Sequence, residues 1–276
     1  MNCQKNKTVF LINLKILLLV SCTCHSAAQT LVSCIDPVCH YQMIDSMFNS
    51  PQNINLLFIE KESPLNYHLH IAGQSSSLYT TSQYAENHEA IAAVNGSFFD
   101  MDKGGSVTYF EKNDSVIGRT RTPGQKWAVA DSIINGAIIL GKEQTLKIEY
   151  ANADQFYEKS DKEAFVMVSG PLLIIDSIPQ RLPDMSFTHR RHPRTSVGIT
   201  RESIIFITID GRSEQSAGMS LYETQEYLLG LGCTDALNLD GGGSTSMWIK
   251  EKGIVNIPSD TRGERPVANA LLILKK

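Results

Sequence analysis

Short apolar runs bounded by turn-forming residues dominate this chain from about residue 53 onward, and they limit the folds open to it. The runs are rich in Val, Ile, Leu and Phe and are flanked by Gly, Pro, Asn or Asp, which is the pattern of β-strands. They are NINLLFIE (53–60), YHLHIAG (67–73), AIAAVN (90–95), AIIL (137–140), AFVMVSGPLLII (164–175), SIIFITI (203–209), ALNL (236–239) and ANALLILK (268–275). The chain is therefore predicted to be mainly β-sheet.

One segment, SLYETQEYLLGLG at residues 220–232, has the features of a helix. Ser220 and Glu223 have the spacing of a capping box, in which each residue satisfies a backbone amide of the other. Three leucines share one side of the segment, and Gly232 suits a helix end. We predict a helix here.

This helix lies between the runs 203–209 and 236–239. A strand, helix, strand order permits these two strands to pair in parallel through a right-handed crossover, whereas the rest of the chain favours antiparallel pairing. We therefore predict an α+β fold, with a mixed, largely antiparallel sheet and a few flanking helices.

Length and composition favour a single domain. The chain has 276 residues, is 42% hydrophobic and shows no long repeat, low-complexity tract or obvious linker. That is enough apolar material for one large core. The formal net charge of −4 argues against a general nucleic-acid binder, which would carry a basic surface.

The first 28 residues have the pattern of an export signal. Lys5 and Lys7 precede the apolar VFLINLKILLLV, and small residues follow. Two processing routes fit. Residues 1–28 can be an export signal cut after Ser-Ala-Ala, or residues 1–21 can be a lipoprotein signal that leaves Cys22 as the lipid-anchored residue. Either route places the mature protein in the periplasm or cell envelope.

The body of the chain contains three cysteines. Cys34 and Cys39 either form a local disulfide in an oxidising compartment or stay unpaired as small hydrophobic residues, and Cys233 follows the predicted helix and is expected to be buried. The three thiols lack the second close pair that a zinc site would need.

Three of the predicted strands end in a polar residue followed by glycine. Asn95 precedes Gly96, and Asp210 and Asp240 each precede a glycine in the same way. If the strands share one sheet, these side chains can meet at one rim, where a rigid sheet holds irregular loops around a ligand. We predict a binding site at this rim.

The sequence DGGGST at 240–245 is the most unusual of these strand ends. Glycine tolerates positive φ, so the amides of Gly241, Gly242 and Gly243 can turn inward as a nest for an anion such as phosphate, with Ser244 and Thr245 adding hydroxyls. The alternative is a plain glycine-rich hairpin. The lysine of a Walker loop is missing.

Arginines supply a second anion-binding feature. Arg194 and Thr195 adjoin the strand-like VGIT, so Arg194 is expected to point into the structure, where its planar fork matches phosphate oxygens. The neighbouring His189, Arg190, Arg191 and His192 are expected at the surface, and the two histidines lack further metal ligands nearby. Arg265 either pairs with the adjacent Glu264 or reaches the rim.

Several motifs occur in one order: AAVNGSFFD (92–100), VSGPLLI (168–174), RTSVGI (194–199), TIDGRSEQSAGMSLYETQEYLLGLGCTDALNLDGGGSTSM (208–247) and RPVANALLI (265–273). Together they resemble the phosphodiester glycosidase family. The resemblance divides the chain into an unassigned part at 29–87 and a phosphodiester glycosidase domain at 88–276. Ser97 departs from the family, in which glycine is common at that position.

The resemblance implies removal of a sugar, often N-acetylglucosamine, from a sugar-1-phosphodiester, leaving a phosphomonoester. Glycosidases generally use two carboxyl groups, and Asp210 and Asp240 are the candidate pair, with Asp100 and Glu264 in reserve. Charge neutralisation matters more than a strong general acid, because the leaving phosphate has a second pKa of about 6. The predicted phosphate and substrate ligands are Gly96, Arg194, Thr195, Arg212, the glycine amides, Ser244, Thr245 and Arg265.

Asn95 is expected to bond a sugar hydroxyl or to orient an aspartate. No cofactor is required by this scheme. One alternative is a metal-dependent phosphodiesterase that uses Asp210, Asp240 and Asp100 to hold a divalent cation. Another is a non-catalytic surface protein that binds phosphorylated glycans. The sugar, the stereochemical course and the oligomeric state stay open.

Overall fold

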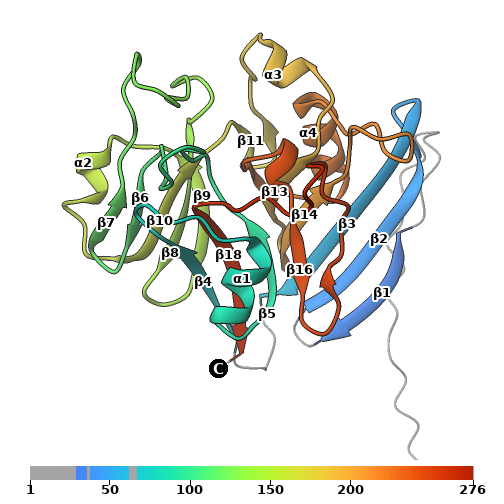
Figure 1. The fold of residues 1–276 in the computed structure, drawn as a ribbon, viewed down its shortest axis with the longest axis horizontal. Helices are drawn as coiled ribbons and strands as arrows, with labels where there is room; N and C mark the ends of the chain where they lie inside the picture. Colours follow the sequence, from blue (N-terminus) through green and yellow to red (C-terminus); the bar gives the residue numbers. More distant parts are fainter. Residues whose placement is uncertain (1–28, 36–37, 62–66, 276) are drawn as a thin grey trace, which may run out of the picture.

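Antiparallel strands make up most of the regular secondary structure, as the short apolar runs predict. The computed structural model describes residues 29–35, 38–61 and 67–275. In that part of the chain the strands form one eight-stranded sheet and two five-stranded sheets, accompanied by four short α-helices (Figure 1). The predicted α+β fold with a largely antiparallel sheet is confirmed.

The eight-stranded sheet contains the strands on either side of the predicted helix. Its order is β1 (Thr30–Ile35), β2 (Val38–Met47), β3 (Ser50–Glu60), β14 (Ser203–Ile209), β13 (Arg194–Ile199), β15 (Asp235–Asn238), β11 (Leu172–Ile175) and β12 (Ile178–Pro179). The parallel pairing of β14 with β15 does not form, because β13 lies between them and pairs antiparallel with both. The helical crossover is long enough to pass over one intervening strand.

The two smaller sheets lie beside each other (Figure 1). One has the order β7 (Ser115–Gly118), β6 (Phe110–Lys112), β10 (Glu163–Ser169), β8 (Gly136–Gly141) and β9 (Leu146–Tyr150). The other has the order β17 (Gly253–Ile254), β16 (Met247–Ile249), β5 (Ala90–Asn95), β18 (Asn269–Lys275) and β4 (Tyr67–Gly73). Because β3 pairs with β14 in the large sheet and β4 pairs with β18 in the second small sheet, the stretch before residue 88 contributes strands to both.

The helices are short. They are α1 (Thr81–Asn87), α2 (Asp154–Tyr157), α3 (Ser186–His189) and α4 (Leu221–Gly230), with a 3₁₀ turn at η1 (Gly242–Ser244). The predicted helix is α4, and its capping box is confirmed: Ser220 Oγ accepts from the Glu223 amide at 3.2 Å, and Glu223 Oε2 accepts from the Ser220 amide at 2.8 Å. None of the described helices has the length and apolar character needed to cross a membrane.

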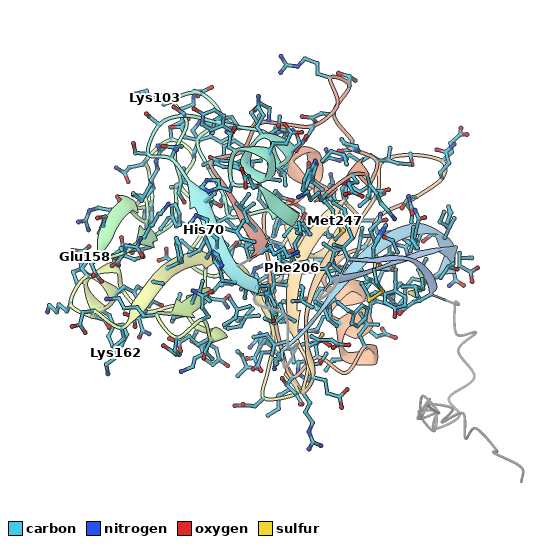
Figure 2. The ribbon with its side chains drawn as sticks, turned by 90° about the horizontal axis from the view of Figure 1, so that it is seen from below. His70, Lys103, Glu158, Lys162, Phe206 and Met247 are labelled. Carbon is cyan, nitrogen blue, oxygen red and sulfur yellow. A yellow bond between two sulfur atoms is a disulfide. The ribbon has the colours of Figure 1, made fainter. Side chains whose placement is uncertain are left out.

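The largest core cluster lies between the eight-stranded sheet and the two smaller sheets. Leu57, Val197 and Phe206 of the large sheet pack there with Ile138 and Met247 of the smaller sheets. Figure 2 shows Phe206 and Met247 near the middle of the molecule, whereas Lys103, Glu158 and Lys162 lie at its periphery. A second cluster on the outer face of the large sheet is covered by α4.

The inner face of the large sheet turns polar at one end. Alternate residues of a strand share a face, so the positions two residues from Leu57, Phe206 and Val197 face the same interior. Those positions hold buried polar residues, namely Asn55, Thr208 and Thr195. The polar end of this layer is where the glycine-rich loop lies.

The cysteines of the body are placed as follows. A disulfide joins Cys34 and Cys39, linking β1 to β2, and the open alternative of two free thiols is thereby settled. Cys233 is unpaired and buried, as predicted. The predicted export signal and Cys22 lie outside the described residues.

Candidate functional site

The ends of three strands meet around the backbone of Asp240. Its amide donates to the Gly96 carbonyl at 3.0 Å, and its carbonyl accepts from Asn95 Nδ2 at 2.7 Å. Asn95 Oδ1 accepts in turn from Thr195 Oγ1 at 2.7 Å and from the Ser246 amide at 3.1 Å. Asn95 is fully buried, so of its two predicted roles the structure favours orientation of an aspartate over contact with a sugar.

Asp240 presents its carboxyl group to a cavity of about 430 Å³. Burial raises the pKa of this carboxyl to about 6, although the Ser244 hydroxyl, the Arg265 charge and the Gly241 amide all favour the ionised form. The Gly241 amide donates to Asp240 Oδ1 at 3.0 Å. A carboxyl group that titrates near neutrality and faces a cavity is suited to acid, base or nucleophilic chemistry.

The cavity is polar on one side and apolar elsewhere. Its volume is within the range of about 300–1,000 Å³ that is usual for small-molecule sites. Asp240 and Arg265 are its two charged lining residues, and the others are Phe98, Phe99, Met101, Val107, Trp127, Ala128, Val129, Ala130, Ile133, Met185 and Phe187. Segments from five parts of the chain therefore converge on it.

Arg265 reaches this rim, which was one of its two predicted positions. Its guanidinium forms two hydrogen bonds with Asp260, at 2.8 and 2.9 Å, and Nη1 lies 3.4 Å from Ser244 Oγ. Its carboxylate partner is thus Asp260 and not Glu264. A Cβ on Gly243 would overlap Arg265 Nη2 and Asp260 Oδ1, so a larger residue there would have to displace this ion pair.

The glycine loop does not form the predicted anion nest. The Gly242 amide donates to the Pro193 carbonyl at 2.9 Å, and the Ser244 and Thr245 amides close the 3₁₀ turn onto Gly241 and Gly242. These amides are already satisfied within the protein. The glycines instead allow close approach of side chains. Gly242 has a φ of +60°, and Nη2 of the exposed Arg212 lies 2.9 Å from the position that a Cβ on Gly242 would occupy.

Asp210 lies deeper than the sequence suggests, since it is only 2% exposed and does not line the cavity. Its carboxylate accepts from Asn53 Nδ2 at 2.6 Å, from Asn256 Nδ2 at 3.3 Å and from the Ile257 amide at 3.1 Å. Burial raises the pKa of Asp210 to about 6, against these hydrogen bonds. Asp210 therefore acts as an internal acceptor and not as an accessible partner of Asp240.

Asn256 links this carboxylate to the glycine-rich loop. Its Nδ2 also donates to the Thr245 carbonyl at 3.1 Å, and its Oδ1 accepts from the Met247 amide at 2.7 Å. Asn53 and Asn256 are not among the residues predicted from the sequence. A polar residue at the start of an apolar run was the only signal for Asn53, and Asn256 had none of comparable strength.

Arg194 points inward, as predicted, but its fork is occupied. Nε donates to the Met219 carbonyl at 2.9 Å, and Nη2 donates to the carbonyls of Phe187 at 2.9 Å and Arg190 at 2.8 Å. Only 1% of the residue is exposed. Burial, and next the nearby Arg212 charge, lower the pKa of Arg194 to about 10. The predicted bidentate grip on phosphate is not available to this side chain.

Arg194 instead supports a wall of the cavity. Its guanidinium carbon lies 5.1 Å from the ring centroid of Phe187, a lining residue, and two of its hydrogen bonds hold the backbone of α3 and the residue that follows it. Thr195 and Thr245 are likewise buried, Thr195 against Asn95, so their hydroxyls do not face the cavity.

The two reserve carboxyl groups are engaged elsewhere. Asp100 forms an ion pair with Arg121 at 2.8 Å, and the pKa of Asp100 falls to about 2 because hydrogen bonds from the Lys103 amide and Arg121 outweigh the effect of burial. Glu264 accepts from the amide and hydroxyl of Ser82 at the start of α1, at 2.8 and 2.7 Å. Neither lines the cavity.

The basic run before β13 is only partly a surface loop. Arg191 bonds Glu223, Ser50 Oγ and the Phe48 carbonyl, which corrects its predicted surface position. His189 is exposed and pairs with Asp184 at 2.7 Å. Across the described ranges, no group of three or more His, Cys, Asp and Glu side chains is arranged to hold a metal ion.

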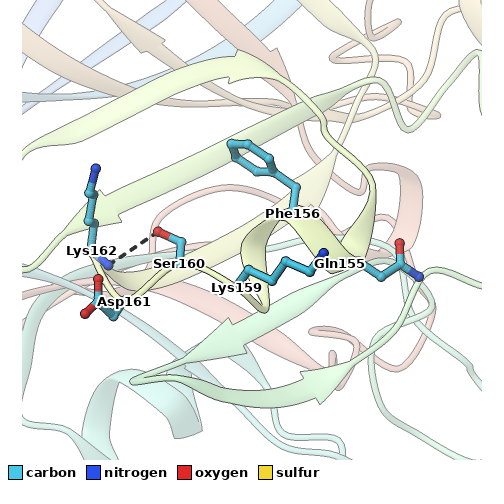
Figure 3. A pocket seen from close by; sticks show the side chains of 6 residues that line it. All are labelled: Gln155, Phe156, Lys159, Ser160, Asp161 and Lys162. Atoms are coloured by element: carbon cyan, nitrogen blue, oxygen red, sulfur yellow. Dashed lines mark hydrogen bonds between the residues drawn. The ribbon is translucent and has the colours of Figure 1, made fainter.

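A larger hollow of about 590 Å³ lies at α2, at a distance in sequence from the glycine loop (Figure 3). Its lining residues are Gln155, Phe156, Lys159, Ser160, Asp161 and Lys162. All come from one short stretch of chain, and charged side chains of both signs surround it. It lacks the convergence of distant segments that distinguishes the Asp240 cavity.

The part of the chain that forms the Asp240 cavity is similar to known proteins. A sequence profile described as "Phosphodiester glycosidase" matches residues 88–274, which include the glycine loop and every lining residue of the Asp240 cavity. The chain belongs to the phosphodiester glycosidase family. The resemblance noted from the motifs is confirmed.

Relatives of this family member come from bacteria and animals. The SPbeta prophage-derived uncharacterized protein YomE of Bacillus subtilis is 28% identical over 70% of this chain and 29% of its own length. N-acetylglucosamine-1-phosphodiester alpha-N-acetylglucosaminidase is 24% identical in Bos taurus, over 66% of this chain, and 37% identical in Mus musculus, over 61%. The chain spans about a third of the length of these relatives.

Solved structures share the fold. The catalytic domain of the zebrafish N-acetylglucosamine-1-phosphodiester alpha-N-acetylglucosaminidase, auto-inhibited by its pro-peptide, superposes with a TM-score of 0.69 at 17% identity. That match covers 90% of this chain and 88% of the other. A hypothetical protein from Synechocystis superposes with a TM-score of 0.60 at 15% identity, covering 87% of this chain and 62% of the other.

Proposed function

We propose that this phosphodiester glycosidase family member is an exported enzyme that hydrolyses the bond between the anomeric carbon of a sugar and a phosphodiester. The products would be the free sugar, of the N-acetylglucosamine kind, and a phosphomonoester. The observation that carries the proposal is the presence of Asp240 and Arg265 on one side of a cavity of suitable size, in a chain of this family.

Asp240 is the proposed catalytic residue. In its ionised form it would act on the anomeric carbon directly or on the water that attacks it, and the transition state carries positive charge on the ring that a carboxylate stabilises. Its position depends on Asn95 and Gly96, which hold its backbone from both sides. Asp210 would support the same loop through Asn256, away from the substrate.

Stabilisation of the departing phosphate is assigned to two cations. The bond from C1 to the phosphate oxygen breaks, water supplies the hydroxyl on C1, and its proton passes to the solution because the phosphate group needs little protonation. Arg265 lines the cavity and is placed to contact the phosphate. Ser244 is fully buried and does not line the cavity, so its Oγ, 3.4 Å from Arg265 Nη1, would support the guanidinium and would not contact the phosphate. Arg212, which is exposed and lies beside Gly242, is the second cation at this loop.

The metal-dependent phosphodiesterase finds less support in these side chains. It needs Asp210, Asp240 and Asp100 to share one cation, yet Asp100 is paired with Arg121 and Asp210 is surrounded by amide donors. The other alternative, a non-catalytic glycan-binding protein, would bind its ligand in the same cavity without hydrolysing it. Location in the periplasm or cell envelope, with or without a lipid on Cys22, is proposed from the leader sequence. One protein of similar fold is described as a putative exported protein from Burkholderia pseudomallei.

The test is hydrolysis in ¹⁸O-labelled water, followed by NMR and mass spectrometry, with UDP-N-acetylglucosamine and a methyl phosphodiester of N-acetylglucosamine as substrates. Label in the sugar is expected. Label in the phosphate would replace the proposal with a phosphodiesterase, and saturable binding without product would replace it with a binding protein.

A further inference from the structure

The apolar side of the Asp240 cavity contains one residue with an unusual combination of exposure and restraint, Trp127. It lines the cavity, yet 37% of its surface is exposed. Its φ of +66° lies in the left-handed region, which a bulky side chain seldom adopts. Backbone strain of this kind persists only where the surrounding structure enforces it, and it is common at ligand sites.

Several contacts enforce this conformation. Trp127 Nε1 donates to Asp102 Oδ2 at 3.0 Å, and the Lys126 ammonium pairs with the same carboxylate oxygen. Arg121 donates to the Lys126 carbonyl at 2.5 Å and forms its ion pair with Asp100. The segment before Trp127 is therefore tied to the loop that follows Phe99. The indole ring is held at its polar edge, and the Lys126 ammonium lies over one of its faces, 5.8 Å from the ring centroid, so the opposite face is the one left to contact a ligand.

The chemistry of the substrate determines what such a ring would contact. A sugar-1-phosphodiester has a charged group at one end and a pyranose ring whose C–H groups form an apolar face. The charged group belongs with Arg265, because burying it against the aromatic side would leave it without partners. The pyranose ring is then directed to the side formed by Trp127, Phe98 and Phe187.

We propose that Trp127 is the surface on which the pyranose ring of the substrate stacks, and that Asp102 is the positioning residue that orients its indole. An indole fixed at one edge gives a large contact at little cost in conformational entropy. The inference rests on the proposed function. It adds a specificity-determining residue on a loop that carries none of the motif residues of the site.

Steady-state kinetics test the proposal on two phosphodiesters that share one sugar and differ in the aglycone, one methyl and one nucleotide. Trp127→Ala should raise KM about tenfold on both, with kcat changed much less, because stacking contributes alike to the ground and transition states. Trp127→Phe should restore most of the affinity. Asp102→Asn should raise KM less than Trp127→Ala does, and should make the indole fluorescence easier to quench with acrylamide.

Phe156→Ala is the matched control. Phe156 is an aromatic residue with 57% exposure that lines the separate hollow at α2 (Figure 3), so its loss should leave both KM values unchanged. An unchanged KM in Trp127→Ala would overturn the proposal. A rise confined to the nucleotide substrate would also overturn it, because that result would assign Trp127 to the aglycone.

Binding separates this inference from the proposed function. Titration of the wild-type protein with N-acetylglucosamine 1-phosphate should change the tryptophan emission, and the change should be absent in Trp127→Phe, where the buried Trp248 remains. If no phosphodiester is hydrolysed but this titration succeeds, the catalytic proposal fails and the stacking role stands. If the wild type hydrolyses the phosphodiester but the wild type and Trp127→Phe give identical titrations, only the stacking role is contradicted.

Discussion

Asn95 Nδ2 lies 2.7 Å from the backbone carbonyl of Asp240, although 145 residues separate them in the chain. Two strands from different sheets, β5 and β15, end at this contact. A buried amide therefore fixes the backbone of the one aspartate that faces the cavity. Replacing Asn95 with Ala should leave the Thr195 hydroxyl and the Ser246 amide without their shared acceptor.

For Asn95→Ala we expect a loss of stability of about 1–3 kcal/mol, the usual cost of buried polar groups left without partners, together with at least a tenfold fall in kcat. Denaturant unfolding and turnover at saturating substrate measure the two effects. Thr195→Val, which removes one donor but keeps the bond to Asp240, should lower stability with less effect on kcat. Equal kcat losses in the two variants would contradict an orienting role for Asn95.

Asp240→Asn should lower kcat at least about a hundredfold, the scale of one positioned catalytic group, with its melting temperature close to that of the wild type. Asp210→Asn should show the opposite balance: it places an amide donor opposite Asn53 and the Ile257 amide, so its main effect should be on stability. Near-normal turnover in Asp240→Asn would remove this residue from the chemistry.

The pH profile should report the Asp240 carboxyl. Its pKa is raised to about 6, and the ionised form is the active one in the proposed mechanism, so kcat/KM should fall as the pH drops through about 6. Arg265→Gln removes a charge that favours the ionised form and should move this limb to higher pH, whereas Arg265→Lys should leave it nearly in place. If the acid limb of the kcat/KM profile changes in Asp210→Asn and not in Arg265→Gln, the titrating group is Asp210.

Arg194→Lys should destabilise the protein, because a lysine cannot reproduce three hydrogen bonds to the carbonyls of Met219, Phe187 and Arg190 and would leave buried acceptors unpaired. We expect a loss of about 2–4 kcal/mol by denaturant unfolding. The exposed Arg190→Lys is the control and should be neutral. A large rise in KM with unchanged stability would return Arg194 to direct phosphate contact.

His70 should make stability fall in acid. Burial, and next the Lys112 charge, lower the pKa of His70 to about 4, and Nε2 is buried without a hydrogen-bond partner. The unfolded chain therefore binds more protons than the folded chain between about pH 6.5 and pH 4, and the stability that neutral His70 provides is lost as the pH falls through that range. His70→Phe should flatten the change, measured by urea unfolding at successive pH values. An identical slope in the variant would refute it.

The sequence determined the features that depend on local pattern. The short apolar runs, the capping box of Ser220 and Glu223 and the order of the motifs sufficed for the α+β fold, for α4 and for the family. Local spacing also brought Cys34 and Cys39 within reach of each other. These features follow from residues that are neighbours in the chain.

Only the tertiary structure decided which polar residues face the cavity. Asp210 and Asp240 have the same local pattern, a strand end before glycine, but packing turned one toward Asn53 and Asn256 and left the other at a cavity. Arg194 and Arg265 differ in the same way, since three carbonyls from two segments of the chain engage the guanidinium of Arg194. Accessibility and hydrogen-bond partners are set by distant segments, and strand pairing across three sheets is what brings those segments together.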